Sequence, residues 1–247
     1  MASEAFIIHL ARAKSRRSAV EEAVLNVGMP ATVLDAVDGQ KLSDEELAAC
    51  YSSRPLFQPH YPFLLGRGEI ACFQSHRSAW RAIVEKELDF GVVLEDDVEI
   101  DRENLSKAVC CFKEKNNMNL YISLQTRPLR SSGRVIYENA GCELIEFTPI
   151  PLRTSGQIVG REAAIRLLAI SEKIDRPVDC FLQLNWITSV RVLCANPSGI
   201  AQWSENIPES FAQAAEKKSI LEKIKRELFR TIYRALINLR SKINKTS

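Results

Sequence analysis

The sequence is short of long apolar runs and of cysteine pairs. No run of about 18 apolar residues, the length that a membrane-spanning helix needs, occurs among its 247 residues. The apolar stretch 5–10 is too short for the core of a secretory signal, and His9 interrupts it. The seven cysteines are an odd number without C-x-x-C spacing. We therefore expect reduced thiols in a cytoplasmic protein.

Histidine is also scarce, and one nucleotide-binding motif is missing. The three histidines, His9, His60 and His76, have no ligand spacing to a cysteine, which argues against a zinc site. The string G-x-x-x-x-G-K-[ST] does not occur, which argues against a P-loop. Apolar residues are 46% of the chain and charged residues 26%, so a sizeable core is expected.

What is present begins with the pattern of a β-α-β unit. Residues 6–10 predict a buried strand, residues 15–27 a helix with one apolar face, and residues 32–34 a second strand. Gly28 and Pro30 end the helix. A strand, a helix and a strand in this order predict a parallel sheet.

The rest of the chain continues the alternation of strands and helices. Ser43 and Glu46 have the spacing of a capping box that starts a short helix. Residues 51–68 have the composition of a loop. Strands are expected at residues 90–94, 120–124, 142–147, 157–159 and 191–194, and helices at 69–87, 104–115, 161–171 and 179–189. The chain is therefore expected to be an α/β protein with a mostly parallel, twisted sheet.

The most informative segment is a buried strand that ends in three carboxylates. Residues 92–94 are apolar, and Glu95, Asp96 and Asp97 follow directly. Ligands of open α/β sheets bind at the carboxyl ends of strands. Adjacent carboxylates repel each other, and hard cations such as Mg²⁺ or Mn²⁺ prefer their oxygens and bridge to phosphates. The segment therefore predicts a cation site, with a solvated acidic turn as the alternative.

A glycine-bearing loop opens the helix that precedes this strand. Gly66 and Gly68 lie at its start, and Ser75 and His76 lie within its first turns. A helix N-terminus with free main-chain N–H groups suits an anion. The alternative for His76 is a helix histidine that bonds to neighbouring backbone.

With these segments in place, the chain resembles glycosyltransferase family 25. The resemblance rests on G-E-I-A-C-F-Q-S-H-R-S-A-W at residues 68–80 and V-V-L-E-D-D-V at 92–98. Further ordered pieces are I-I-H-L-A-R-A-K-S-R-R at 7–17, D-A-V-D-G at 35–39, T-S-G-Q-I-V-G-R-E-A-A at 154–164, P-V-D-C-F-L at 177–182 and N-P-S-G-I-A-Q at 196–202. Together they cover roughly residues 5–205.

The resemblance implies a GT-A type fold, a Rossmann-like domain that binds a nucleotide sugar beside a D-x-D-type acidic motif. Glu95-Asp96-Asp97 matches that motif, and it implies Asp97 and Glu95 as ligands of Mn²⁺ or Mg²⁺. Where many members have an aromatic residue after the Ser155-Gly156 pair, this chain has Gln157, so we expect its contacts to the sugars to differ. The residues implied for binding the donor are Leu10, Arg12, Arg17, Asp38, Gly68, Glu69, Ser75, His76, Glu95, Asp96, Ser155 and Gly156.

The implied reaction is an inverting transfer of a hexose from a UDP-sugar to the core of a lipooligosaccharide or lipopolysaccharide, which forms a β-linkage. Galactose is the preferred donor sugar, and glucose is the alternative. The attacking hydroxyl needs a carboxylate as general base. Asp179 is the candidate, although it could equally cap the helix that begins there.

Two other functions would also use acids at the end of a strand. One is a Mg²⁺-dependent phosphatase or nucleotide hydrolase, which releases phosphate without an acceptor. The other is a carbohydrate-binding module without catalysis, which binds a ligand and releases no nucleotide. The helix that carries His76, the acidic strand end and the Ser155-Gly156 pair favour the transferase.

The net charge of +2 hides a basic tail. Residues 216–247 hold ten Lys or Arg and three Asp or Glu. The preceding residues hold 23 Lys or Arg and 28 Asp or Glu. Apolar residues recur at helical spacing along it: Leu221, Ile224, Leu228, Ile232, Ala235, Leu239 and Ile243. We therefore separate a domain, 1–208, from a helical tail, 209–247, that is basic and amphipathic.

Such a tail fits an anionic membrane surface. The acceptor would then be lipid-linked, and the protein cytoplasmic and peripheral to the inner membrane. Packing of the apolar stripe on the domain, or on a second subunit in a homodimer, is the alternative. Nucleic acid is not expected, because the tail has few stacking aromatics and the rest of the chain is acidic.

Overall fold

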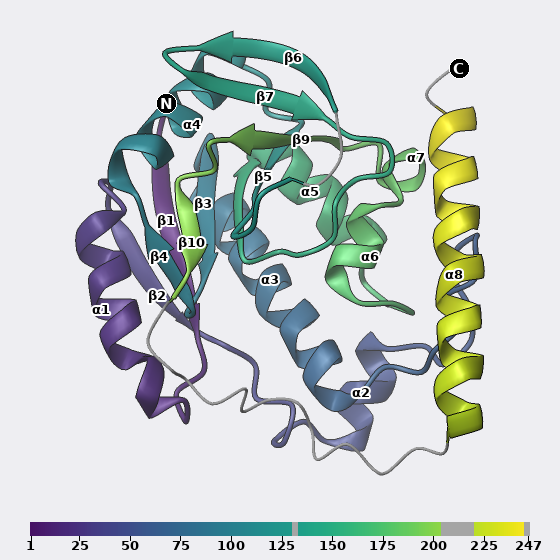
Figure 1. The fold of residues 1–247 in the computed structure, drawn as a ribbon. Helices are drawn as coiled ribbons and strands as arrows, with labels where there is room; N and C mark the ends of the chain where they lie inside the picture. Colours follow the sequence, from purple (N-terminus) through teal and green to yellow (C-terminus); the bar gives the residue numbers. More distant parts are fainter. Residues whose placement is uncertain (130–132, 204–219, 245–247) are drawn as a thin grey trace.

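The computed structural model of the chain describes residues 1–129, 133–203 and 220–244, and its centre is an eight-stranded sheet (Figure 1). The strands of this sheet are β1 (Ser3–His9), β2 (Ala31–Asp35), β3 (Phe90–Glu95), β5 (Leu120–Leu124), β6 (Arg134–Asn139), β7 (Cys142–Glu146), β8 (Gly156–Gly160) and β9 (Arg191–Asn196). Their order is β2-β1-β3-β8-β5-β9-β7-β6. From the pairings, six strands point one way and two, β8 and β7, point the other, which confirms the predicted α/β fold with a mostly parallel sheet.

Helices cover both faces of the sheet. The helices are η1 (Lys14–Arg16), α1 (Arg17–Asn26), α2 (Asp44–Cys50), α3 (Arg67–Glu85), α4 (Arg102–Lys115), α5 (Arg161–Ile170), α6 (Val178–Leu182), α7 (Asn185–Thr188) and α8 (Ile220–Ile243). Side chains alternate between the faces of a strand, so Val93 of β3 packs with α3 and α5, and its neighbours Val92 and Leu94 pack with α4. This two-sided burial explains why the central strands read as continuous apolar runs.

The strand order creates a switch point between β1 and β3. The chain leaves β1 through α1 to β2 on one side, and then passes through α2 and α3 to β3 on the other side of β1. β1 is parallel to both neighbours, with Ile8 opposite Glu95. Ligands of open α/β sheets bind at such a point, at the carboxyl ends of the strands.

Most elements lie where the sequence predicts them. The capping box of α2 is present, with Ser43 and Glu46 bonded reciprocally. Three short strands were not predicted: β6, and the pair β4 (Val98–Ile100) and β10 (Ile200–Gln202), which form a small separate sheet. The single helix predicted at 179–189 is wrong. The backbone of Leu184 leaves the helical region, with ψ of 47°, and the buried Gln183 bonds to Ile150 O at 2.6 Å, so tertiary contacts divide the segment into α6 and α7.

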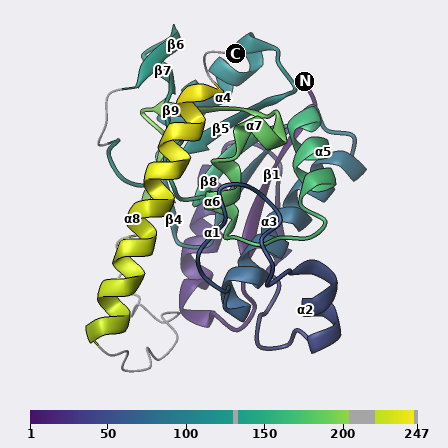
Figure 2. The same cartoon turned by 90° about the vertical axis from the view of Figure 1, so that its right-hand side faces the viewer.

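The C-terminal helix α8 packs along one side of the domain (Figure 2). Its inner face buries Tyr233 and Ile237 against Cys180 and Leu184. The Tyr233 hydroxyl accepts a hydrogen bond from Nη1 of the fully buried Arg176 at 3.1 Å. The alternative expectation for the tail was that its apolar stripe packs on the domain. It is wrong for Leu228, Ile232, Leu239 and Ile243, which are exposed, because Tyr233 and Ile237 make the contact instead. The predicted boundary at 208 and 209 lies outside the described residues.

Apolar side chains at helical spacing are exposed on the outer side of α8. They are Leu228, Ile232, Leu236, Leu239 and Ile243, and we call them the outer stripe. Among the described residues, no helix has the length and apolar content to cross a membrane.

Candidate active site

The three acidic residues lie at the switch point, where β3 ends beside the end of β1. The side chains of Glu95 and Asp97 are partly open to solvent, 29% and 24% exposed, whereas that of Asp96 is buried, with 7% exposed. Three carboxylates in such a short segment repel each other unless each finds a positive partner or a hydrogen-bond donor. The structure meets this demand differently for each of them.

Asp96 is fully engaged with the segment that follows β1. Its Oδ2 lies 2.8 Å from His9 Nδ1 and 3.3 Å from the main-chain N of Leu10. Its Oδ1 accepts a hydrogen bond from Arg16 Nη1 at 2.5 Å. Both oxygens therefore join the end of β3 to β1 and η1. The predicted donor contact of Asp96 stays a prediction, and these bonds give the residue a structural role.

Asp97 is the least compensated of the three. Among the described residues, its buried Oδ1 has no hydrogen-bond partner, and Oδ2 lies 3.8 Å from Arg16 Nη1. Desolvation raises the pKa of Asp97 above its usual value and the charge of Glu95 raises it further, whereas Arg16 lowers it. The main-chain O accepts hydrogen bonds from Trp203 N at 2.9 Å and Gln202 Nε2 at 3.1 Å. The residue is thus fixed, and a divalent cation fits the unsatisfied oxygen.

Glu95 is held by donors from two other elements. Its Oε1 is 3.1 Å from His76 Nε2 and 3.3 Å from Thr154 Oγ1. Its main-chain N donates to Ser155 O at 2.9 Å, which places the predicted Ser155-Gly156 pair beside the acidic residues. Both side-chain contacts fall on one oxygen. Among the described residues, Oε2 has no hydrogen-bond partner and so could ligate a cation.

His76 is buried in a chain of hydrogen bonds that runs away from Glu95. Gln157 Nε2 lies 2.8 Å from His76 Nδ1, and Trp80 Nε1 donates to Gln157 Oε1 at 2.9 Å. Gln157 is fully buried in the middle of the sheet. The side chain of Gln157 ends on His76 and Trp80, and the expectation that the contacts to the sugars differ stays a prediction.

The predicted general base shares the surroundings of the acidic residues. Asp179 lies in the first turn of α6, and its oxygens accept hydrogen bonds from Cys180 N at 2.7 Å and Arg153 N at 3.3 Å. Each oxygen keeps a lone pair for a substrate hydroxyl. Arg153 contacts Asp179, and its neighbour Thr154 contacts Glu95 Oε1. The two carboxylates therefore face the same segment of the chain.

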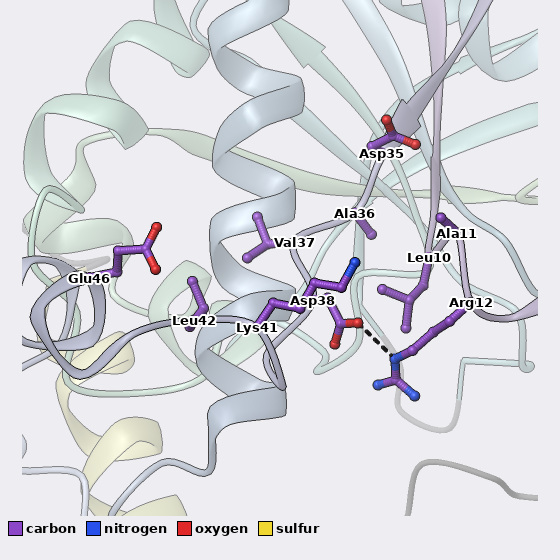
Figure 3. A pocket seen from close by; sticks show the side chains of 10 residues that line it. All are labelled: Leu10, Ala11, Arg12, Asp35, Ala36, Val37, Asp38, Lys41, Leu42 and Glu46. Atoms are coloured by element: carbon purple, nitrogen blue, oxygen red, sulfur yellow. Dashed lines mark hydrogen bonds and ion pairs between the residues drawn. The ribbon is translucent and has the colours of Figure 1, made fainter.

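A pocket of about 340 Å³ lies at the carboxyl ends of β1 and β2 (Figure 3). Three predicted donor-binding residues, Leu10, Arg12 and Asp38, line it. Arg12 Nε lies 3.0 Å from Asp38 Oδ2. The predicted Ser75 supports the pocket from α3, because its hydroxyl accepts a hydrogen bond from Val37 N at 2.9 Å. Ser75 thus holds one wall of the pocket.

The segment after β1 connects this pocket to the acidic residues. Leu10 lines the pocket and donates its N–H to Asp96. Directly after Asp38 the chain approaches α3 closely, because a Cβ on Gly39 would lie 2.6 Å from the main-chain O of Arg67. Only glycine fits at this point of the D-A-V-D-G segment, since the obstacle is backbone rather than a flexible side chain.

Other predicted site residues lie at the edge of this arrangement or inside the core. Arg17 is exposed at the start of α1, and its neighbour Arg16 reaches the carboxylates instead. Gly68 and Glu69 lie exposed in the first turn of α3, where Glu69 Oε2 accepts the N–H of Gly66 at 2.8 Å. The carboxylate of Glu69 therefore already occupies a main-chain N–H group at the helix N-terminus, where an anion was expected to bind.

Packing within the sheet leaves no space for a side chain at Gly156. A Cβ there would lie 2.6 Å from Ile200 Cδ1 and 3.1 Å from Leu124 Cβ. The space beside Gly156 is thus filled by β10 and β5. Its neighbour Ser155 remains half-buried beside Glu95, and its predicted contact to the donor sugar stays a prediction.

Sequence reasoning missed several residues of the site. Thr154 and Gln202 contact the acidic segment from distant parts of the chain, and Trp80 and Gln157 were not recognised as partners of His76. Their sequence separations from these partners range from 4 to more than 100 residues. No local pattern reports contacts that depend on strand order.

The fold and the acidic residues define the class: an α/β protein with a candidate cation site at the switch point of its sheet, beside a pocket. The family model of glycosyltransferase family 25 (LPS biosynthesis protein) matches residues 2–182. The chain therefore belongs to glycosyltransferase family 25.

Relatives with established names include both transferases and inactive members. The chain is 34% identical over 111 residues to procollagen galactosyltransferase 2 of Homo sapiens. This match covers 40% of this chain and 16% of that protein. A glycosyltransferase 25 family member of Drosophila melanogaster is 30% identical over 185 residues, 72% of this chain and 30% of that protein. The inactive glycosyltransferase 25 family member 3 of Mus musculus is 38% identical over 97 residues, 38% of this chain and 16% of that protein. The chain thus spans less than a third of the length of each.

Among solved structures, a glycosyltransferase involved in the glycosylation of the major capsid of PBCV-1 is 14% identical. The match covers 70% of this chain and 64% of that one, with a TM-score of 0.37.

Proposed function

We propose that the chain transfers a hexose from a UDP-sugar to a glycan acceptor, with galactose as the preferred sugar and the core of a lipooligosaccharide or lipopolysaccharide as the acceptor. The reaction proceeds with inversion and forms a β-linkage. One observation carries the proposal: the buried Oδ1 of Asp97, which has no hydrogen-bond partner in the described part of the chain, lies beside Glu95 at the switch point of the sheet. Membership of glycosyltransferase family 25 supports it.

The parts of the donor have separate places in this proposal. The nucleoside occupies the pocket lined by Leu10, Arg12 and Asp38. Asp97 and Glu95 would hold Mn²⁺ or Mg²⁺, and such a cation would supply positive charge against the negative charge that develops on the leaving diphosphate. The donor sugar then lies toward Ser155, whose main-chain O bonds to Glu95 N. The remaining chemistry belongs to protein side chains.

Asp179 acts as the general base in this proposal. It takes the proton of the attacking hydroxyl on a carboxylate oxygen while the hydroxyl oxygen bonds to the anomeric carbon and the sugar–phosphate bond breaks. The main-chain N–H groups of Cys180 and Arg153 keep the carboxylate oriented. A positioned base of this kind contributes roughly 10²- to 10⁴-fold to a rate.

The experiment is a donor panel with the full-length chain and Mn²⁺. We expect slow release of UDP from UDP-galactose, less from UDP-glucose, and none in EDTA. An acceptor with a truncated lipooligosaccharide core should accelerate release and gain one hexose by mass. Release of inorganic phosphate from simple phosphate esters would indicate a phosphatase or nucleotide hydrolase. Sugar binding without nucleotide release would indicate a binding module, or a relationship to the inactive members.

We further propose that the outer stripe of α8 binds an anionic membrane surface, which would bring the site to a lipid-linked acceptor. The stripe runs along α8 over residues 228–243, and Lys225, Arg234, Arg240 and Lys242 lie exposed on the same helix. Apolar residues that enter the acyl boundary and cations that attract anionic headgroups are the two features of an interfacial helix. A homodimer through the same stripe is the alternative occupant.

A further inference from the structure

The hydrogen bonds around His76 have a fixed direction, because they begin at a group that can only donate. The indole N–H of Trp80 has no lone pair to accept with, so Gln157 Oε1, at 2.9 Å, must be its acceptor. The amide nitrogen of Gln157 then faces His76 Nδ1 at 2.8 Å and donates to it. All three side chains are buried, so solvent cannot replace these partners.

The direction of the chain decides the tautomer of His76. A neutral imidazole carries its proton on one nitrogen and accepts on the other. Since Nδ1 accepts from Gln157, Nε2 must carry the proton and donate it to Glu95 Oε1 at 3.1 Å. Reversal of the Gln157 amide would place its NH₂ against the Trp80 N–H, two donors facing each other in the core.

This tautomer also bears on which residues can bind a cation. Potential ligand atoms of Cys72, His76 and Glu95 lie within 4.8 Å of one another, a set that would suit a soft metal such as zinc. To ligate a metal, His76 would need a free lone pair on Nε2. The hydrogen bonds of Trp80 and Gln157 fix the tautomer that carries a proton on Nε2, so this lone pair is not available. The same proton holds Glu95 Oε1, so that Oε2 is left for a cation shared with Asp97.

We infer that Trp80, Gln157 and His76 form a positioning relay that fixes the Glu95 carboxylate for a hard cation and keeps His76 from acting as a metal ligand. The part that concerns Glu95 rests on the proposed function. The part that concerns the His76 tautomer does not, because it follows from the hydrogen bonds alone. None of the three residues of the relay touches a reacting atom, so each is a positioning residue.

The tautomer can be measured directly on the full chain. With only three histidines, long-range ¹H–¹⁵N spectra at about pH 8 are readable, and the His76→Gln variant identifies the His76 signals. We expect a pyridine-like Nδ1 and a protonated Nε2. In Gln157→Glu, which can only accept from both neighbours, Nδ1 should become protonated. Gln125→Leu, which removes another buried glutamine from the end of a strand, should leave the His76 signals unchanged.

A second measurement tests the effect on Glu95. Binding of Mn²⁺ in the presence of UDP, followed by the EPR signal of free Mn²⁺, should weaken about 10-fold in Gln157→Leu, as for other residues that orient a ligand. His76→Gln keeps an N–H donor for Glu95 and should bind Mn²⁺ more tightly than His76→Leu. Circular dichroism confirms that each variant is folded.

Three results would overturn the inference. The first is a proton on Nδ1 of His76 in the unmodified chain. The second is Mn²⁺ binding that is equal in Gln157→Leu and the unmodified chain. The third is equal binding in His76→Gln and His76→Leu. If the unmodified chain bound no Mn²⁺ at all, the cation site of the proposed function would fail, and the spectra would still decide the tautomer.

Discussion

Arg16 Nη1 lies 2.5 Å from Asp96 Oδ1 and 3.8 Å from Asp97 Oδ2, so one guanidinium neutralises the first carboxylate and compensates the second only weakly. The two neighbours in the sequence therefore take different roles. Asp96 closes the loop after β1, and Asp97 keeps an unsatisfied charge at the switch point. Three adjacent acids thus contain one structural residue and two candidate ligands.

Replacement of Asp97 by asparagine should abolish the response to the cation. Asparagine keeps the shape and one oxygen but removes the charge, so we expect Mn²⁺ binding in the presence of UDP to weaken by about 100-fold. Mn²⁺-dependent release of UDP should fall in parallel. Glu99→Gln is the matched control, since Glu99 is an exposed acid two residues further on. Equal losses in the two variants would contradict a specific role for Asp97.

Replacement of Asp179 by asparagine should separate transfer from donor binding. We expect transfer to an acceptor to fall by about 100-fold or more, because the attacking hydroxyl loses its base. Binding of UDP and Mn²⁺ should stay unchanged, since neither is assigned to Asp179. Titration calorimetry with UDP and a transfer assay with the same preparation provide the comparison. A variant with near-normal turnover would leave Asp179 as a helix cap only.

The buried pair Asp175 and Arg176 should make stability depend on pH. Burial alone would raise the pKa of Asp175, but Arg176 and the N–H groups of Leu56 and Phe57 hold it below the usual value of 3.8. The stabilisation is therefore present above pH 3.8 and is lost as the pH falls through the lower folded value. Asp175→Asn leaves the cation of Arg176 buried and unpaired, which should cost about 3–5 kcal/mol of unfolding free energy at pH 7.

Urea denaturation at several pH values checks this prediction. The difference between Asp175→Asn and the unmodified chain should shrink as the pH falls below 3.8, because protonation of Asp175 then favours the unfolded state of the unmodified chain. The control is Asp44→Asn, which breaks a solvent-exposed ion pair with Arg67 and should cost less than about 1 kcal/mol. A pH-independent difference would contradict the role of the ionised pair.

A charge in the outer stripe should weaken membrane binding. Ile232→Asp places a carboxylate in the middle of the apolar face, so we expect less flotation with vesicles that contain phosphatidylglycerol at low salt. Thr231→Asp adds the same charge at the adjacent exposed position and should have the smaller effect. Sedimentation analysis of both variants tests the alternative. A dimer of the unmodified chain that Ile232→Asp dissociates, without any vesicle binding, would favour a second copy as the partner.

The fold could be predicted where local patterns decide it. The strand at 120–124 matches β5 in both bounds, and the capping box of Ser43 and Glu46 begins α2 as expected. Local patterns could not reveal that β8 runs antiparallel between β3 and β5, because strand direction depends on long-range pairing. They also missed the exposed strand β6, whose alternation of burial is weak.

The site, like the fold, could be predicted only where a local sequence pattern determines it. Leu10, Arg12 and Asp38 meet in one pocket because β1 and β2 are neighbours in a parallel sheet, which the β-α-β pattern predicts. The role of Gln157 was not predictable, because nothing in its sequence neighbourhood refers to Trp80, which lies 77 residues away. The division of roles between Asp96 and Asp97 depends on the position of one guanidinium.

The docking of α8 has a geometric consequence for any acceptor attached to a lipid. Tyr233 is locked against Arg176 and packs edge-on against the Tyr61 ring at 5.3 Å, so the helix is part of the rigid body and not a flexible tether. If such a helix lies on a flat surface, it fixes the orientation of the whole domain relative to that surface. The height and tilt of the switch point above a bilayer would then be constant. Only acceptor sugars at one fixed distance from the lipid would reach the site.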